Sequence, residues 1–167
     1  MAAPGDRPRN RILLVCMGNI CRSPMAQGML RHRLRELQWQ EQVVIDSAGT
    51  HGYHAGSAPD ERAQMATARR GIDISDLRAR AVAAEDFPCY DLILAMDEAN
   101  LGYLRAAAAA EHRRKIHLFM EYATGDAGRS VPDPYYGGPI GFERVLDMLE
   151  EATEGLLLRL RAELEEL

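Results

Sequence analysis

The sequence is poor in cysteine, with only Cys16, Cys21 and Cys89 among its 167 residues. An odd and small number of cysteines does not build the disulfide framework of a small secreted domain. In a reducing compartment, a cysteine in a suggestive sequence setting is more often a chemical group than a structural one. The three thiols are therefore candidates for chemistry rather than for cross-linking.

Long apolar runs are also missing. Residues Met1–Pro8 contain no apolar stretch and do not have the pattern of a secretion signal. The apolar runs at 12–15 and 92–95 are far shorter than the roughly 20 residues that a membrane-spanning helix needs. We therefore expect a cytoplasmic protein that does not insert into membranes.

Positive charge is not in excess, since 20 Lys and Arg residues face 25 Asp and Glu residues, for a formal net charge of -5. Binding to a nucleic-acid backbone usually depends on a clustered Lys/Arg surface. The basic runs at 31–33 and 112–115 stand beside acidic residues, which is typical of solvated helix faces. We therefore expect no nucleic-acid partner.

What the chain does have is an alternation of strand and helix patterns. Short apolar or β-branched runs predict strands at 11–15, 43–45, 91–96 and 116–120. Four helices are expected. The first begins at Ser23-Pro24, the second runs from 59–61 to near Gly71, the third is the Ala-rich stretch that ends at Ala110, and the last covers 142–166. Strands that are apolar on both faces indicate an α/β fold with three layers, a four-stranded parallel sheet with helices on both faces.

The length suits one domain with one core. We expect a flexible N-terminal tail over 1–10 and a single domain over 11–167, because no repeat or composition shift marks a second one. Leucines at three-to-four spacing in the last helix form a stripe that is expected to dock on the sheet. Ligands of parallel α/β sheets bind at the carboxyl ends of the strands. Cys16, Ser47, Asp97 and the loop that carries Asp133 all follow a predicted strand.

The segment 15–24, Val-Cys-Met-Gly-Asn-Ile-Cys-Arg-Ser-Pro, links the first strand to the first helix. Its backbone can curl so that successive N–H groups form an anion nest at a helix N-terminus. Gly18 and Asn19 are the residue types that tolerate the positive φ of such a curl. The planar fork of Arg22 matches two phosphate oxygens. The pattern predicts a phosphate-binding loop.

The same surroundings act on Cys16. A helix N-terminus and a neighbouring cation both favour the thiolate form of a cysteine. We therefore expect Cys16 to be a thiolate beneath the bound phosphate, placed for in-line attack. Ser23, which is also the expected helix N-cap, could donate a hydrogen bond to the sulfur and ease its departure.

Residues 16–24 resemble the signature loop of the low-molecular-weight protein tyrosine phosphatases. Residues 133–136 (Asp-Pro-Tyr-Tyr) resemble the second motif of that family, and 47–50 and 95–97 also fit its pattern. The resemblance implies hydrolysis of phosphotyrosine in proteins through a phosphocysteine, without metal or other cofactor. It also implies that inorganic phosphate or other oxyanions bind in the loop, to residues Met17, Gly18, Asn19, Ile20, Cys21 and Ser23.

Asp133 is expected to be the general acid, because a phenolate leaves poorly unless it is protonated as the P–O bond breaks. Pro132 and Pro134 stiffen the loop that presents it. Asp97 is interpreted as a helix N-cap rather than as a helper in catalysis. Asp133 thus joins Cys16 and Arg22 as the expected catalytic set.

Aromatic side chains are expected to wall a slot for the substrate ring. Tyr135 and Tyr136 are expected to form one wall of the slot, and Tyr53 and Met17 are candidates for the opposite rim. His51 and His54 could suggest a metal pair, but no third ligand accompanies them, and we expect no metal.

Two departures from the family pattern concern the loop. Many relatives carry a histidine that bonds the serine steadying the phosphate loop, and that place here corresponds to Leu77. Ser47 is therefore expected to steady Asn19 without this partner. Cys21 matches a second loop cysteine found in some relatives, close enough to Cys16 in sequence to form a disulfide.

Three other functions are compatible with parts of the pattern. A thioredoxin-coupled arsenate reductase shares the loop but needs two further cysteines near the third strand, where this chain has only Cys89. A protein-arginine phosphatase resembles this loop but has threonine at the place of Ile20. A phosphopeptide-binding module without turnover would not need the complete set of Cys16, Arg22 and Asp133.

Overall fold

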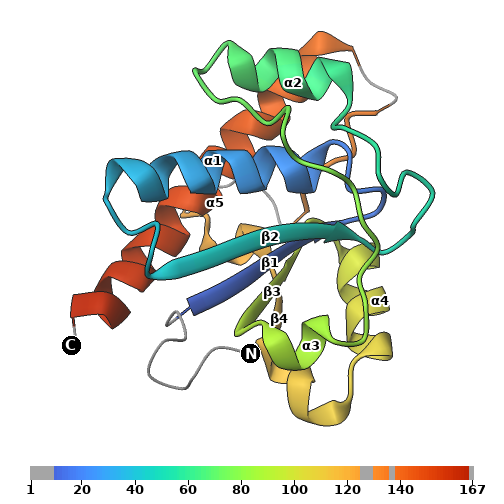
Figure 1. Cartoon of the computed structure of the whole chain (residues 1–167), viewed down its shortest axis with the longest axis vertical. Helices are drawn as coiled ribbons and strands as arrows, with labels where there is room; N and C mark the ends of the chain where they lie inside the picture. Colours follow the sequence, from blue (N-terminus) through green and yellow to red (C-terminus); the bar gives the residue numbers. More distant parts are fainter. Residues whose placement is uncertain (1–9, 125–129, 136–137, 166–167) are drawn as a thin grey trace.

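The computed structural model describes residues 10–124, 130–135 and 138–165 and contains one four-stranded sheet (Figure 1). The strand order is β2-β1-β3-β4, and all three strand pairs are parallel. The sheet lies between two layers of helices, so the predicted three-layer α/β fold is confirmed. The expected tail over 1–10 lies outside the described residues except for Asn10, which begins β1.

The secondary-structure elements follow the predicted alternation with several changes of boundary. In chain order they are β1 (Asn10–Cys16), α1 (Arg22–Glu36), β2 (Val43–Gly49), α2 (Glu61–Ala68), α3 (Asp86–Cys89), β3 (Leu92–Ala95), α4 (Glu98–Ala107), η1 (Ala110–Lys115), β4 (Ile116–Leu118), η2 (Phe119–Tyr122) and α5 (Pro139–Glu165).

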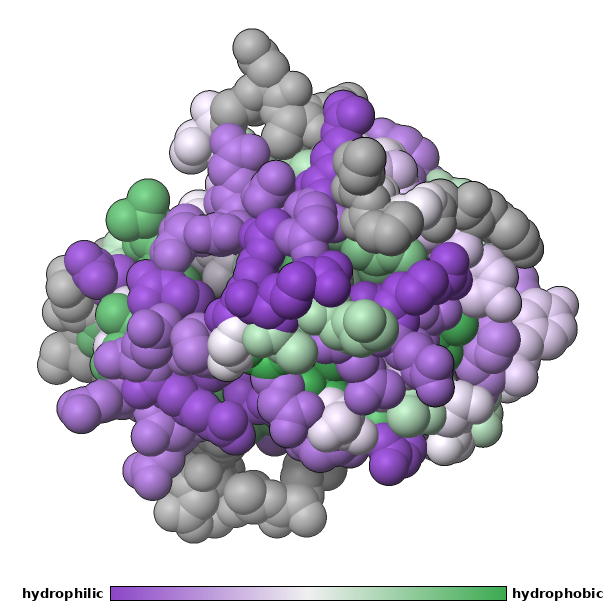
Figure 2. Space-filling view, turned by 90° about the horizontal axis from the view of Figure 1, so that it is seen from above, coloured by the Kyte–Doolittle hydropathy of each residue, from purple (hydrophilic) through white to green (hydrophobic). Residues whose placement is uncertain are grey.

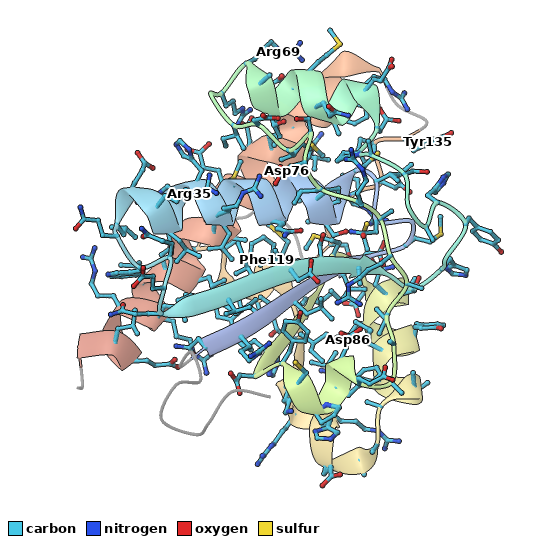
Figure 3. The ribbon with its side chains drawn as sticks, viewed as in Figure 1. Arg35, Arg69, Asp76, Asp86, Phe119 and Tyr135 are labelled. Atoms are coloured by element: carbon cyan, nitrogen blue, oxygen red, sulfur yellow. The ribbon has the colours of Figure 1, made fainter. Side chains whose placement is uncertain are left out.

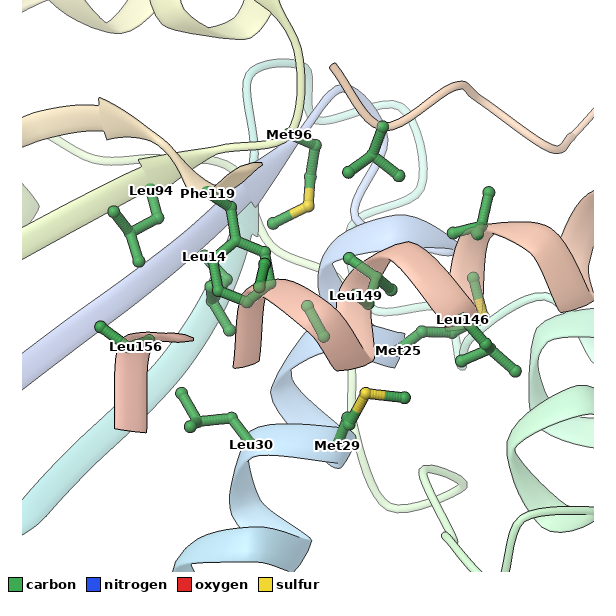
Figure 4. Close-up of a cluster of buried hydrophobic side chains, with 14 of the residues drawn as sticks. Leu14, Met25, Met29, Leu30, Leu94, Met96, Phe119, Leu146, Leu149 and Leu156 are labelled. Atoms are coloured by element: carbon green, nitrogen blue, oxygen red, sulfur yellow. The ribbon is translucent and has the colours of Figure 1, made fainter. Parts of the chain in front are cut away.

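One face of the sheet is covered by α1 and α5 (Figures 1 and 4). Because side chains alternate across a strand, Ile12 and Leu14 point to this face. They pack with Met25 and Leu30 of α1 in one buried cluster. The predicted leucine stripe of α5 belongs to the same cluster through Leu146, Leu149, Leu156 and Leu160, so its docking on the sheet is confirmed.

The opposite face is covered by α3 and α4 (Figure 1). Leu13 and Val15 of β1 point to this face and form a second cluster with Phe87 of α3 and Leu104 of α4. The short helix α3 was not predicted, because its four residues carry too little periodicity for a helical pattern.

Several predicted elements end earlier than expected, and the fourth strand and the helix predicted up to Ala110 have clear physical reasons for it. The fourth strand stops at Leu118, because its neighbour β3 has only four residues and leaves no further backbone partner. Phe119 and Met120 instead enter a 3₁₀ turn, in which both side chains are buried. The fourth helix ends at Ala107, and Ala108 is extended and buried under the sheet. Burial here overrides the high helix propensity of alanine.

The surface over α2 is predominantly hydrophilic (Figure 2). Arg70, which follows α2, pairs with Glu143, Asp147 and Glu150 of α5 at N–O distances between 2.8 and 3.2 Å. These contacts join α2 to the long C-terminal helix. Within the described residues, no helix has the length and apolar content to cross a membrane.

Candidate active site

The site forms where the chain order of the strands reverses. After β1 the chain moves to β2 on one side, and it returns to place β3 on the other side of β1. In such sheets a crevice opens beyond the carboxyl ends of the two strands flanking the switch point. Cys16 ends β1, and Asp97 follows β3 by two residues. The topology therefore brings residues from distant parts of the sequence to one edge of the sheet.

The loop between Cys16 and Arg22 connects β1 directly to α1. The helix begins at Arg22, with Cys21 as N-cap and without a side-chain capping bond. The prediction that Ser23 caps this helix is therefore wrong, and its hydroxyl is used elsewhere. The N–H groups of Arg22 and Ser23 lie in the first helical turn, where no intrahelical acceptor is available to them. They are suited to hold an anion at the positive end of α1.

Cys16 lies at the base of this loop, only 3% exposed. The Ser23 Oγ atom is 3.0 Å from Cys16 Sγ, and the Asn19 backbone N–H donates to the same sulfur over 3.3 Å. The expected contact between Ser23 and Cys16 is therefore present. Both partners can supply a hydrogen to a sulfur that carries negative charge.

Asn19 holds the curl of the loop. Its φ of 57° is in the left-handed region, as expected. Gly18 has no positive φ, so that part of the prediction is wrong. A Cβ atom at Gly18 would lie 3.1 Å from the ring of His54, a tight contact that His54 would have to move slightly to relieve.

The side chain of Asn19 makes three hydrogen bonds. Its Nδ2 donates to Ser23 Oγ at 2.7 Å and to Ser47 Oγ at 3.0 Å, and its Oδ1 accepts from the Arg80 backbone N–H at 3.0 Å. Asn19 is 3% exposed, so these bonds are made away from solvent. The predicted contact between Ser47 and Asn19 is therefore present.

Ser47 has a second partner that the sequence reasoning missed. Its hydroxyl donates to Gln27 Oε1 over 2.6 Å, and both residues are buried. Leu77 packs instead against the apolar cluster between the sheet and α1. The sequence signal for Gln27 was its position, since a polar residue interrupts a run of apolar residues one helical turn after Ser23.

Arg22 is almost completely buried, with 3% of its side chain exposed. Its Nη1 donates to Asp97 Oδ2 at 2.6 Å and to the Val131 carbonyl at 3.0 Å, and its Nη2 lies 3.7 Å from Asp133 Oδ2. Asp97 also caps α4 by accepting from Asn100 N–H at 2.8 Å. The predicted N-cap is confirmed, and the contact with Arg22 is a second role.

Asp133 belongs to a loop tied to the sheet. The Val131 backbone N–H donates to the Met96 carbonyl over 2.7 Å, which fixes the loop beside the end of β3. Asp133 Oδ1 accepts from Tyr135 N–H at 3.0 Å, and a third of the side chain remains exposed. The carboxyl group therefore faces the mouth of the site rather than the core.

A cavity of about 320 Å³ brings most of the predicted residues together. Its lining comprises Cys16, Met17, Gly18, Ile20, Cys21, Arg22, Tyr53, His54, Asp133 and Tyr135. Tyr53 is 82% exposed and stacks on His51, with 5.4 Å between ring centroids. Tyr135 lies on the side of the molecule to which the strand ends point (Figure 3). Tyr136 lies outside the described residues.

Arg62 contacts Tyr135, one of the aromatic residues that line the cavity. The Arg62 guanidinium lies over the ring of Tyr135, 5.3 Å from its centroid, and pairs with Asp60 at 3.0 Å. Although burial opposes it, the hydrogen bonds from Arg62 hold the pKa of the Asp60 carboxyl below its usual value. Arg62 and His54 are site residues that the sequence reasoning did not assign.

The remaining thiols differ in their surroundings. Burial raises the pKa of the Cys21 thiol, and the negative charges of Asp60, Cys16 and Asp133 raise it further. Cys89 packs with the cluster on the opposite face of the sheet from Cys16. This position does not suit a thiol relay of the arsenate-reductase kind.

Among the described residues, no three His, Cys, Asp or Glu side chains are grouped to hold a metal ion.

Comparisons with known proteins agree with this geometry. The family model "Low molecular weight phosphotyrosine protein phosphatase" matches residues 11–166. A low molecular weight protein-tyrosine-phosphatase of Streptomyces coelicolor is 41% identical, with 93% of this chain and 96% of the relative covered. The human low molecular weight phosphotyrosine protein phosphatase is 40% identical over 84% of this chain and 89% of the relative.

Solved structures show the same likeness. A protein tyrosine phosphatase from Entamoeba histolytica, crystallised with Hepes in its active site, superposes with a TM-score of 0.88 and 38% identity, covering 92% of this chain and 97% of the other. YfkJ from Bacillus subtilis superposes with a TM-score of 0.87 and 36% identity, covering 92% and 96%.

Proposed function

Since the chain belongs to the low molecular weight phosphotyrosine protein phosphatase family and is a protein-tyrosine phosphatase, we propose that Cys16, Arg22 and Asp133 carry its reaction. The observation that supports this assignment most strongly is the position of Cys16. Its sulfur lies at the base of the cavity within hydrogen-bond reach of Ser23, and Arg22 and Asp133 line the same cavity.

In the first step, the Cys16 thiolate attacks phosphorus, forming the S–P bond as the bond to the phenolic oxygen breaks. The electron pair of that bond stays on the leaving oxygen, which takes a proton from the Asp133 carboxyl group. Arg22 holds two phosphoryl oxygens with its guanidinium, and the N–H groups at the start of α1 receive the remaining charge. Asp97 fixes the Arg22 side chain for this task through the 2.6 Å bond.

In the second step, a water oxygen attacks phosphorus and the Asp133 carboxylate takes up the proton. The S–P bond breaks, and the electron pair returns to Cys16 as a thiolate. The hydroxyl of Ser23, 3.0 Å from the sulfur, donates a hydrogen bond that stabilises this leaving group. Inorganic phosphate is then released from the loop.

Tyr53, Met17 and Tyr135 form the entrance through which a phenolic ring would reach Cys16. Their exposed surfaces, 82%, 44% and 39% respectively, are available to the ring and to the polypeptide that carries it. We place Tyr136 beside Tyr135 in this role on the strength of the sequence motif. The substrates we propose are proteins phosphorylated on tyrosine, and inorganic phosphate and related oxyanions bind as products or inhibitors.

We propose the cytoplasm as the place of action. Cys16, Cys21 and Cys89 are all free thiols. Reducing compartments maintain cysteines in this form, and the reaction proposed here requires it at Cys16.

The assignment is tested with the Cys16→Ser variant and a chromogenic aryl phosphate. A serine hydroxyl is not ionised in this field, so turnover should fall to background, whereas vanadate binding should persist because Arg22 and the loop remain. The Cys89→Ser variant is the matched control and should keep wild-type turnover. Substantial turnover by a clean Cys16→Ser preparation would refute the nucleophile assignment.

A further inference from the structure

Gln27 is a buried polar residue that the proposed reaction does not use directly. It lies on α1 and is 7% exposed, between Met25, Ala26 and Met29, which belong to the apolar core. One helical turn separates it from Ser23, so both side chains lie on the same side of α1. Ser47 Oγ lies 2.6 Å from its Oε1 atom. Gln27 therefore reaches the group of residues that surrounds Cys16 without lining the cavity.

The hydrogen bonds in this group have a fixed direction. The Arg80 backbone N–H donates to Asn19 Oδ1, so Nδ2 is the atom that faces both serines. An amide nitrogen of this kind only donates. Ser23 and Ser47 therefore both accept from Asn19, at 2.7 and 3.0 Å.

Each serine must then direct its own hydrogen to another acceptor. Ser47 has Gln27 Oε1 at 2.6 Å, and Ser23 has Cys16 Sγ at 3.0 Å. The acceptor on Gln27 thus keeps the Ser47 hydrogen away from Asn19. Without that acceptor, the hydrogen of the buried Ser47 hydroxyl would have no partner. It could then turn toward Asn19 Nδ2, which is itself a donor and cannot accept it.

We propose that Gln27 is a positioning residue for the phosphatase reaction. Its amide oxygen ends a directional chain that runs through Ser47 and Asn19 and leaves the Ser23 hydrogen aimed at Cys16 Sγ. This inference rests on the proposed roles of Cys16 and Ser23. Because the Ser23 hydrogen bond stabilises the departing thiolate, Gln27 acts on the hydrolysis of the phosphocysteine.

The effect is measured by rapid-quench kinetics on an aryl phosphate with a good leaving group. In Gln27→Leu, kcat should fall about tenfold, the factor expected if the lower end of the free-energy penalty for an unpaired buried hydrogen-bonding group is expressed in the barrier of this step. The burst of phenol released in the first turnover should persist, and KM should not rise. In Gln27→Glu, which keeps an acceptor oxygen at the same reach, kcat should stay close to the wild-type value.

Two further variants separate positioning from stability. Gln64→Leu makes the same change on α2, where the side chain bonds the Pro59 carbonyl, and should leave kcat unchanged. Ser47→Ala removes the next hydrogen-bonding group in the series and should reproduce the loss of kcat. It replaces Gln27→Leu as the test variant if Gln27→Leu does not fold. In the double variant Gln27→Leu/Ser47→Ala the two losses of kcat should not add, because both substitutions interrupt the same series of hydrogen bonds.

An unchanged kcat in Gln27→Leu, or in Ser47→Ala should the former not fold, would overturn the proposal. A loss of burst and steady-state rate in proportion to a loss of folded protein would also overturn it, since that result indicates a structural role alone. Absence of aryl phosphatase activity in the wild type, or full activity of Cys16→Ser, would instead refute the proposed function. The two failures are therefore distinguishable.

Discussion

Arg22 and Asp97 are joined by a charge-assisted hydrogen bond across 75 positions of the sequence, with 2.6 Å between Nη1 and Oδ2. Arg22 lies at the start of α1 and Asp97 at the start of α4, on opposite faces of the sheet. Asp97 uses its two oxygens for different purposes, one for Arg22 and one for the Asn100 N–H. A single carboxylate thus caps a helix and orients the guanidinium.

Replacing Asp97 should separate these two roles. We expect Asp97→Ala to lower kcat/KM for an aryl phosphate by about 10–100-fold, because a hydrogen bond to a charged group contributes about 1.5–3 kcal/mol. Asp97→Asn keeps an oxygen for capping but turns an amide NH₂ toward Arg22 Nη1, so it should lose activity to a similar extent and lose little thermal stability. Steady-state kinetics and thermal unfolding of both variants check this. Wild-type kcat/KM in Asp97→Ala would show that Arg22 is held adequately without Asp97.

Asp133→Asn should affect substrates according to their leaving groups. General acid catalysis contributes about 10²–10⁴-fold, and activated phenols with acidic hydroxyls need less of it. We expect the largest loss of kcat/KM for phosphotyrosine and the smallest for nitrophenyl-type phosphates. The measurement is a series of aryl phosphates of graded leaving-group acidity. Equal losses throughout the series would assign the proton transfer to another group.

Ile20 should favour phosphotyrosine over phosphoarginine. Its side chain lines the cavity and gives the wall an apolar character that suits a phenyl ring. We expect Ile20→Thr to narrow the ratio of the two turnover rates by roughly tenfold, the scale of a small apolar change in a binding pocket. Comparing both substrates in both proteins provides the test, and a wild-type preference for phosphoarginine would contradict it.

Cys21 should rescue the enzyme from peroxide. Peroxide oxidises the Cys16 thiolate to a sulfenic acid. A thiolate on Cys21 can then attack the Cys16 sulfur and displace hydroxide, which takes up a proton to become water, and the resulting disulfide is reduced by dithiothreitol. Since burial and the nearby negative charges raise the pKa of Cys21, its thiolate fraction is low at neutral pH and grows as pH rises. Recoverable activity after peroxide should therefore increase from pH 7 to pH 9 in the wild type.

The control for this rescue is Cys21→Ser, which should recover less activity than the wild type at each pH. Mass spectrometry of the oxidised protein should find the Cys16–Cys21 bond only in the wild type. Equal recovery in the two proteins would mean that Cys21 is a loop residue without a protective role.

Local patterns were sufficient for the position of the loop between the first strand and the first helix and for the order of the four strands, but not for the short helix α3. The residues that form the loop, the start of the helix and the candidate chemical groups lie within the nine consecutive residues from Cys16 to Pro24, although the helix begins at Arg22 and not after a Ser23 cap. The boundaries of β4 and α4 could not be predicted from local patterns. They depend on how far the neighbouring strand extends and on the burial of Ala108, which are properties of the packed molecule.

The sequence by itself determined the class of fold, through its alternation of strand and helix patterns, and it supplied the candidates for nucleophile, phosphate clamp and acid, since these candidates follow from residue types at short spacing. Only the tertiary structure decided which side chains support them. Asp97, Gln27 and Arg80 meet the loop because parallel strands end at one edge of the sheet and α1 crosses above it. Hydrogen bonds act over about 3 Å, so partners distant in sequence become visible only when the sheet and its helices have brought them together.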